Sequence, residues 1–151
     1  MGHQVRLQSR AFETVSIFVD TSVWSLALRR DAPAVTPAVS TLVQALESGE
    51  PVLTTGLVLQ ELLQGFAGPK GRVAILDRFS ALPLLRPDRE DHIGAAELRN
   101  LCRRRGLQLG TIDALLAQIC IRHGLTFLTA DADFARMARY CDLKVWKNTE
   151  R

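Results

Sequence analysis

The segment 16–22 restricts the fold of this chain more than any other feature. Its apolar residues 17–19 suit a buried strand, and they run directly into the carboxylate of Asp20 and two hydroxyl residues. In an open α/β sheet, ligands bind at the edge where the strands end. Asp20 is therefore a candidate site residue, although an Asp at this position can also serve only to cap the following helix.

Short strand-like and longer helix-like segments alternate along the chain. Strands are expected at residues 17–19, 51–54, 82–85, 126–129 and 143–146, with helical segments between them. Pro83 places its strand at an edge of the sheet, and Thr111 is expected to cap the helix that ends at Gly124. The alternation predicts a single α/β domain over residues 16–151, with a mainly parallel sheet, after a polar tail at residues 1–15.

The composition excludes several classes of protein. The chain of 151 residues is 47% hydrophobic and 23% charged, so it can fill one core and is not disordered. Neither the three cysteines nor the histidines have the spacing of a disulfide framework or a zinc site. No run approaches the ~18 apolar residues of a membrane span, and residues 1–14 lack the apolar core of a signal peptide. We therefore expect a cytoplasmic protein with reduced thiols.

Four carboxylates stand within apolar sequence. They are Asp20 at the end of the first strand, Glu61 on the helix after the second strand, Asp113 at the start of a helix and Asp131 after the strand before the last. Taken singly, each has a structural explanation as a cap, a partner of the helix dipole or a boundary residue. If they converge, each close pair repels by ~1 kcal/mol in water and ~4 kcal/mol at an effective dielectric constant near 20, so the cluster must take up protons or cations. Oxygen ligands without His or Cys favour Mg²⁺ or Mn²⁺. Such ions activate water and hold phosphate groups, which indicates phosphodiester hydrolysis.

The motifs around these acids resemble those of PIN-domain nucleases, and more narrowly those of VapC-type toxins. They occur in family order at residues 19–24, 59–62, 111–117 and 128–134. The resemblance implies a three-layer α/β/α sandwich and a Mg²⁺- or Mn²⁺-dependent endoribonuclease acting on RNA. It also implies a homodimer and a VapB-like antitoxin whose C-terminal segment blocks the active site. The tail at residues 1–15 departs from the family, whose members usually start almost at the first strand.

By position, the resemblance makes Asp20, Glu61, Asp113 and Asp131 the catalytic, metal-binding acids, with Asp133 as a supporting or second-metal ligand. Nearby hydroxyls are suited to holding these acids or a metal-bound water, but capping or turn formation explains them equally well. These hydroxyls belong to Thr21, Ser22, Thr111 and Thr129.

Basic residues could contact RNA phosphates around the acids, although a solvated surface explains them as well. They are Arg29, Arg30, Arg103, Arg104, Arg105, Arg136, Arg139, Lys144 and Lys147. Two other functions stay open beside the toxin: a PIN-fold interaction module, and an RNA-processing nuclease outside a toxin–antitoxin pair. A phosphatase of the haloacid dehalogenase type is disfavoured, because it would need a second Asp where this chain has Ser22.

Overall fold

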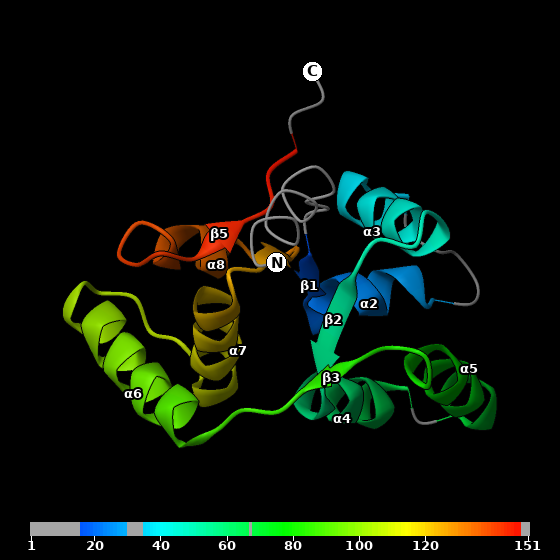
Figure 1. Cartoon of the computed structure of the whole chain (residues 1–151), viewed down its shortest axis with the longest axis horizontal. Coiled ribbons are helices and arrows are strands. Elements are labelled where there is room, and N and C mark those ends of the chain that lie inside the picture. The colour runs from blue at the N-terminus through cyan, green and yellow to red at the C-terminus, as the bar shows by residue number, and fades with distance from the viewer. Residues whose placement is uncertain (1–15, 30–34, 67, 149–151) are drawn as a thin grey trace, which may run out of the picture.

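The computed structural model describes residues 16–29, 35–66 and 68–148, so the predicted tail at residues 1–15 lies outside the described residues. Strands and helices alternate as the sequence indicates (Figure 1). In chain order they are β1 (Ile17–Val19), α2 (Thr21–Ala27), α3 (Pro37–Glu47), β2 (Val52–Thr55), α4 (Gly56–Gly65), α5 (Pro69–Phe79), β3 (Leu84–Leu85), α6 (Arg89–Arg104), α7 (Thr111–His123), β4 (Thr126–Leu128), α8 (Ala132–Met137) and β5 (Lys144–Val145).

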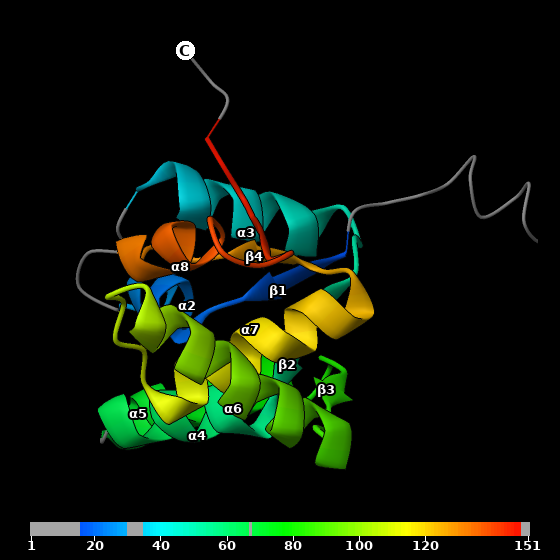
Figure 2. The ribbon, with the colours of Figure 1, turned by 90° about the vertical axis from the view of Figure 1, so that its left-hand side faces the viewer.

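The five strands form one sheet in the order β3-β2-β1-β4-β5, and every neighbouring pair is parallel. β3 forms one edge, as Pro83 predicts. Helices α6 and α7 lie on one side of the sheet, and α2 and α3 lie on the other (Figures 1 and 2). The predicted three-layer α/β/α sandwich with a parallel sheet is therefore confirmed.

Aromatic rings pack through the centre of the sandwich. Phe18 on β1 and Phe127 on β4 are fully buried, with ring centroids 5.7 Å apart. Phe127 also meets the edge of Phe134 on α8 at 4.5 Å. These contacts hold the two central strands and α8 as one unit, and they place the residues that follow β1 and β4 on a rigid support.

The strand order creates a switch point between β1 and β4. From β1 the chain first moves to β2 and β3 on one side, and it later returns to β4 on the other side. Val19 pairs with Leu128, and the amide of Asp20 donates to the carbonyl of Leu128 at 2.9 Å. Parallel sheets bind ligands outside the carboxyl ends of their strands at such a point, and Asp20 lies there.

The helix α7 ends at Gly124 as predicted, but its predicted cap differs. Thr36 caps α3 by accepting from the amide of Val39 at 3.2 Å, and Gly124 ends α7 with a left-handed φ of 63°. The expectation that Thr111 caps α7 is wrong. Gly110 occupies the cap position because its carbonyl already accepts from the amide of Ala114, so Thr111 is the first residue inside the helix.

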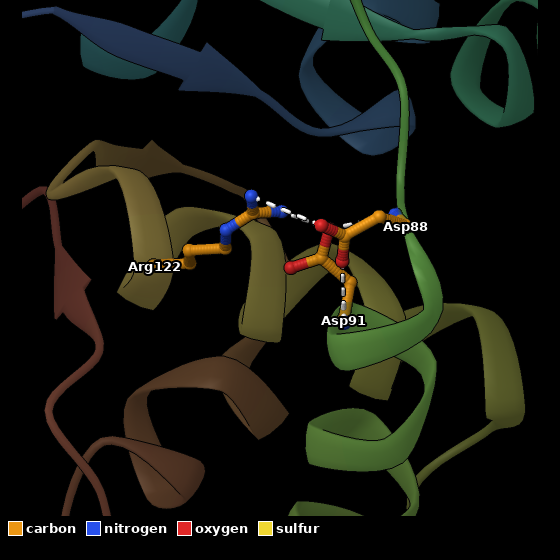
Figure 3. A network of polar contacts seen from close by, with 3 residues as sticks. All are labelled: Asp88, Asp91 and Arg122. Carbon is orange, nitrogen blue, oxygen red and sulfur yellow. Dashed lines mark hydrogen bonds and ion pairs between the residues drawn. The ribbon is translucent and has the colours of Figure 1, made fainter.

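A polar network ties the start of α6 to the end of α7, and Figure 3 shows its three residues. Asp91 is fully buried, and its Oδ2 accepts from Nη1 of Arg122 at 2.6 Å and from the amide of Asp88 at 3.0 Å. Arg122 also pairs with Asp88 at 3.1 Å. The network fixes α6 against α7, the helix whose first turn carries Asp113.

Two further expectations concern the cysteines and the membrane. Cys102 and Cys120 are buried, Cys141 is half-buried, and all three are free thiols, as expected. Among the described residues, no helix has the length and apolar character needed to cross a membrane.

Candidate active site

Asp20 lies at the N-cap position of α2, yet its side chain makes no capping hydrogen bond. It is 6% exposed, and together with Asp91 it is one of two buried carboxylates in the described parts of the chain. Burial of a charged group is unfavourable unless other groups hydrogen-bond to it. The capping alternative therefore does not account for Asp20, and the groups that hold it identify its role.

Two hydroxyl groups hold one oxygen of Asp20. Oδ2 accepts from Oγ of Ser22 at 2.7 Å and from Oγ1 of Thr129 at 2.9 Å. The Ser22 hydroxyl also accepts from the amide of Ala130 at 3.0 Å, and Thr129 Oγ1 accepts from the amide of Asp131 at 3.0 Å. These bonds join the start of α2 to the loop after β4, and they leave Oδ1 of Asp20 for another partner.

Glu61 reaches the same region from α4. Its Oε1 accepts from Oγ1 of Thr21 at 3.1 Å, although the two residues lie 40 positions apart in the chain. Glu61 is half-buried on the helix that follows β2, the strand next to β1. Thr21 and Ser22 therefore each hold a different acid, which decides between the two roles that the sequence allowed for them. The Thr111 hydroxyl makes no hydrogen bond within the described part of the chain.

Asp131 and Asp133 follow β4 and make local bonds. Asp131 caps α8, because its Oδ1 accepts from the amide of Asp133 at 2.9 Å. Oδ1 of Asp133 contacts Nη1 of Arg136 at 3.4 Å, and both side chains are largely exposed. Asp131 thus keeps its second oxygen for a ligand, whereas Asp133 shares its charge with a cation.

The pKa of Asp113 is raised by burial and by the charges of all the other acids. Its pKa is raised from 3.8 to about 6, first by burial and then by the negative charges of Asp20, Asp131, Glu61 and Asp133. A like charge that disfavours ionisation has to lie nearby. The four predicted acids and Asp133 therefore share one electrostatic neighbourhood, although they come from the residue after β1, from α4, α7 and α8, and from the β4–α8 loop.

The acids do not touch one another as ligands of one ion would. Over residues 16–29, 35–66 and 68–148, no three His, Cys, Asp or Glu side chains lie close enough together to hold a metal ion. Carboxylates repel one another unless a proton or cation lies between them, so a spacing within electrostatic reach is physically reasonable. The donor set consists of carboxylate and hydroxyl oxygens, which suits a hard divalent ion.

Trp24 and Phe134 flank the motif acids and are buried core residues. Two arginines nearby make contacts that the sequence did not reveal. Arg105 lies 5.8 Å from the ring of Tyr140. Arg99 donates from Nε to the carbonyl of Leu109 at 2.9 Å, just before α7. No sequence signal pointed to Arg99, because its partner is a backbone atom ten residues away.

Comparison with known proteins agrees with this arrangement. Residues 17–140 match the PIN domain family. The chain is 37% identical over 115 residues to Ribonuclease VapC23 of Mycobacterium tuberculosis, covering 73% of this chain and 87% of that protein. In structure it is similar to a chain of VapBC2 from Rickettsia felis bound to a promoter DNA fragment, with a TM-score of 0.68, 20% identity, and 88% and 100% of the two chains covered.

A third similar protein is VapC20 of Mycobacterium tuberculosis, described as a toxin that cleaves the sarcin–ricin loop. The TM-score is 0.61 and the identity 25%, over 85% of this chain and 98% of that one. The family match covers most of the described chain, and the match to Ribonuclease VapC23 spans most of both proteins. The protein therefore belongs to the PIN domain family and, within it, to the VapC-type members.

Proposed function

We propose that this protein is a Mg²⁺- or Mn²⁺-dependent endoribonuclease and the toxin of a VapBC-type toxin–antitoxin pair. The observation that carries the proposal is the buried Asp20 at the end of β1, whose Oδ2 is held by Ser22 and Thr129 while the adjacent Thr21 holds Glu61. The raised pKa of Asp113 beside these acids agrees with it. The similarity to Ribonuclease VapC23 supports RNA as the substrate. An RNA substrate is consistent with action in the cytoplasm, which is part of the same proposal.

Asp20, Glu61, Asp113 and Asp131 would hold the ion, and Asp133 would support them. When bound, such an ion acidifies its water and stabilises charge on the phosphate. The chain contributes orientation: Ser22 and Thr129 hold Oδ2 of Asp20, and Thr21 holds Glu61. Preset hydroxyls of this kind keep ligand oxygens in place, so less ordering is needed when the ion binds.

The antitoxin and the dimer are parts of the same proposal. The similar VapBC2 structure contains both members of a toxin–antitoxin pair, which supports a VapB-like partner here. A partner that blocks the acidic site needs a cation, because the site itself collects negative charge. We further propose a homodimer, which sedimentation of the purified chain would test.

RNA cleavage tests the enzymatic proposal directly. Wild type, Asp20→Asn and a matched control, Asp77→Asn on the exposed side of α5, are incubated with a structured RNA in Mn²⁺, Mg²⁺ or EDTA. We expect cleavage by the wild type and by Asp77→Asn with either metal, and loss of cleavage in EDTA or with Asp20→Asn. Equal cleavage by all three proteins in EDTA would contradict a metal-dependent nuclease.

The interaction-module alternative predicts no cleavage under any condition by folded protein free of antitoxin. The RNA-processing alternative predicts cleavage without growth arrest when the protein is produced alone in cells. Growth arrest that is reversed by co-producing a small protein encoded beside this one would favour the toxin.

A further inference from the structure

Helices α6 and α7 pack side by side (Figures 1 and 2), and side chains of both helices line a groove. The cavity measures about 240 Å³. Its floor includes the buried side chains of Ala95 and Ala114, and its polar lining comes from His92, Arg99 and Asn100 on α6 and Thr111 on α7. An apolar floor with a few polar groups on one side is the usual form of a ligand site.

Arg99 is held in this groove with most of its donors unused. Its Nε–H donates to the carbonyl of Leu109 at 2.9 Å, which fixes the plane of the guanidinium. An arginine has five N–H donors. In the described parts of the chain, Arg99 has no carboxylate partner within ion-pair distance. A planar cation that is fixed and lacks an anion is suited to a phosphate group.

The groove meets the acidic site at the first turn of α7. Thr111 and Ala114 line the groove, whereas Asp113 between them is coupled to the acids on the sheet side. One turn of helix therefore separates a cationic groove from an anionic site. An RNA chain that is cut at the acids and runs past this turn would bring its neighbouring phosphates to the cationic groove.

We propose that the groove between α6 and α7 holds the RNA chain beside the cleaved bond, with the guanidinium of Arg99 on a backbone phosphate. This inference rests on the proposed nuclease function. His92 and Asn100 supply hydrogen-bonding groups at the same groove, suited to a sugar or base edge. The contact to phosphate gives affinity without reading the base sequence.

The test measures binding of a fluorescent single-stranded RNA in EDTA, where no cleavage occurs. Ala96→Glu places a carboxylate in the groove at an exposed helix position and leaves the Arg99–Leu109 bond intact. Ala74→Glu is the matched control, since Ala74 is also exposed, on the separate helix α5. Arg99→Gln is the second variant, with Arg89→Gln in the exposed first turn of the same helix as its control.

We expect Ala96→Glu and Arg99→Gln to weaken RNA binding about tenfold, while both controls stay within about twofold of the wild type. For Arg99→Gln, the slope of log affinity against log salt should fall by about 0.7, the value for one lost phosphate contact on a single strand. Ala96→Glu should raise KM for cleavage and leave kcat within a few-fold. Melting temperatures show whether each variant is folded.

If folded Ala96→Glu bound RNA as tightly as the wild type, RNA binding in the groove would be contradicted. Metal-dependent cleavage by the wild type would still support the nuclease in that case. Loss of binding in Ala74→Glu equal to that in Ala96→Glu would also overturn it, because a general charge effect would then suffice. A wild type that neither binds nor cuts RNA would overturn both the groove and the proposed function.

Discussion

Thr129 donates its hydroxyl to Oδ2 of Asp20 at 2.9 Å, although the two residues lie 109 positions apart in the chain. The bond is possible because β1 and β4 are parallel neighbours whose ends meet at the same edge. It directs the carboxylate that ends β1 toward the loop that carries Asp131. The first prediction follows from this bond.

Replacing Thr129 with Val removes the hydroxyl but keeps the shape of the side chain. Asp20 then keeps only the bond from Ser22, so we expect Mn²⁺ affinity to fall by about 10- to 100-fold and the free energy of unfolding by about 1 kcal/mol. Titration calorimetry with Mn²⁺ measures the first effect. The control is Thr126→Val at the start of β4, and equal affinities in both variants would argue against the bond as a support of the site.

The raised pKa of Asp113 predicts an unusual pH dependence of stability in EDTA. With its pKa near 6 in the folded protein and 3.8 as its ordinary value, this carboxyl binds more protons when folded. Its contribution to stability is therefore present below pH 4 and is lost as the pH rises through 6. Asp113→Asn should abolish the loss, and the free energy of unfolding at pH 7.5 should exceed that of the wild type by about 1–2 kcal/mol after allowance for solvent screening.

Urea unfolding of the wild type and Asp113→Asn at pH 4 and pH 7.5, both in EDTA, measures this difference. The gain should appear at pH 7.5 and be absent at pH 4. A gain of the same size at both values would show that ionisation of Asp113 is not its cause. Asp77→Asn on exposed α5 should show no gain at either pH.

The buried network at the start of α6 makes a third prediction (Figure 3). Arg122→Met removes the only cation paired with the fully buried Asp91, whose Oδ1 already lacks a hydrogen-bond partner in the described parts of the chain. An unpaired buried acceptor costs about 1–3 kcal/mol, so unfolding should need less urea. Arg103→Met, in the exposed last turn of α6, should change stability by less than about 0.5 kcal/mol.

A second substitution separates the charge from the packing of Arg122. In the background of Arg122→Met, Asp91→Asn replaces the carboxylate that has lost its cation with a neutral amide. We expect the double variant to be more stable than Arg122→Met alone. A double variant that is less stable would show that the stem of Arg122, rather than its charge, supports this end of the helices.

The fold was predictable because its signals are local. Residues 17–19 form a buried strand since three apolar residues in a row suit a strand covered on both faces. Thr36 followed by a proline starts α3, and Pro83 lies at an edge strand. The exception is Thr111, because either Gly110 or Thr111 can precede a helix and only the backbone path decides between them.

That the four acids share one catalytic site stays a prediction, which rests on acids that follow strands or their connections, since parallel strands end at one edge. The sequence also offered the hydroxyls beside these acids as supports but left their role open. Whether Asp20 caps a helix or serves the site depends on bonds to Ser22 and Thr129, and the second of these crosses most of the chain. Arg99 was missed for the same reason, because its partner is the carbonyl of Leu109 and leaves no pattern in the sequence.

The most direct test of the central claim is the melting temperature of the wild type, Asp20→Asn and Asp77→Asn with and without Mn²⁺. If the acids form one metal site, ion at a hundredfold excess over its Kd stabilises the folded chain by about 2.7 kcal/mol, which raises the melting temperature by about 5–10 °C. We predict this rise for the wild type and Asp77→Asn, and a much smaller one for Asp20→Asn. The same rise in all three proteins, or none in the wild type, would contradict a metal site built on Asp20.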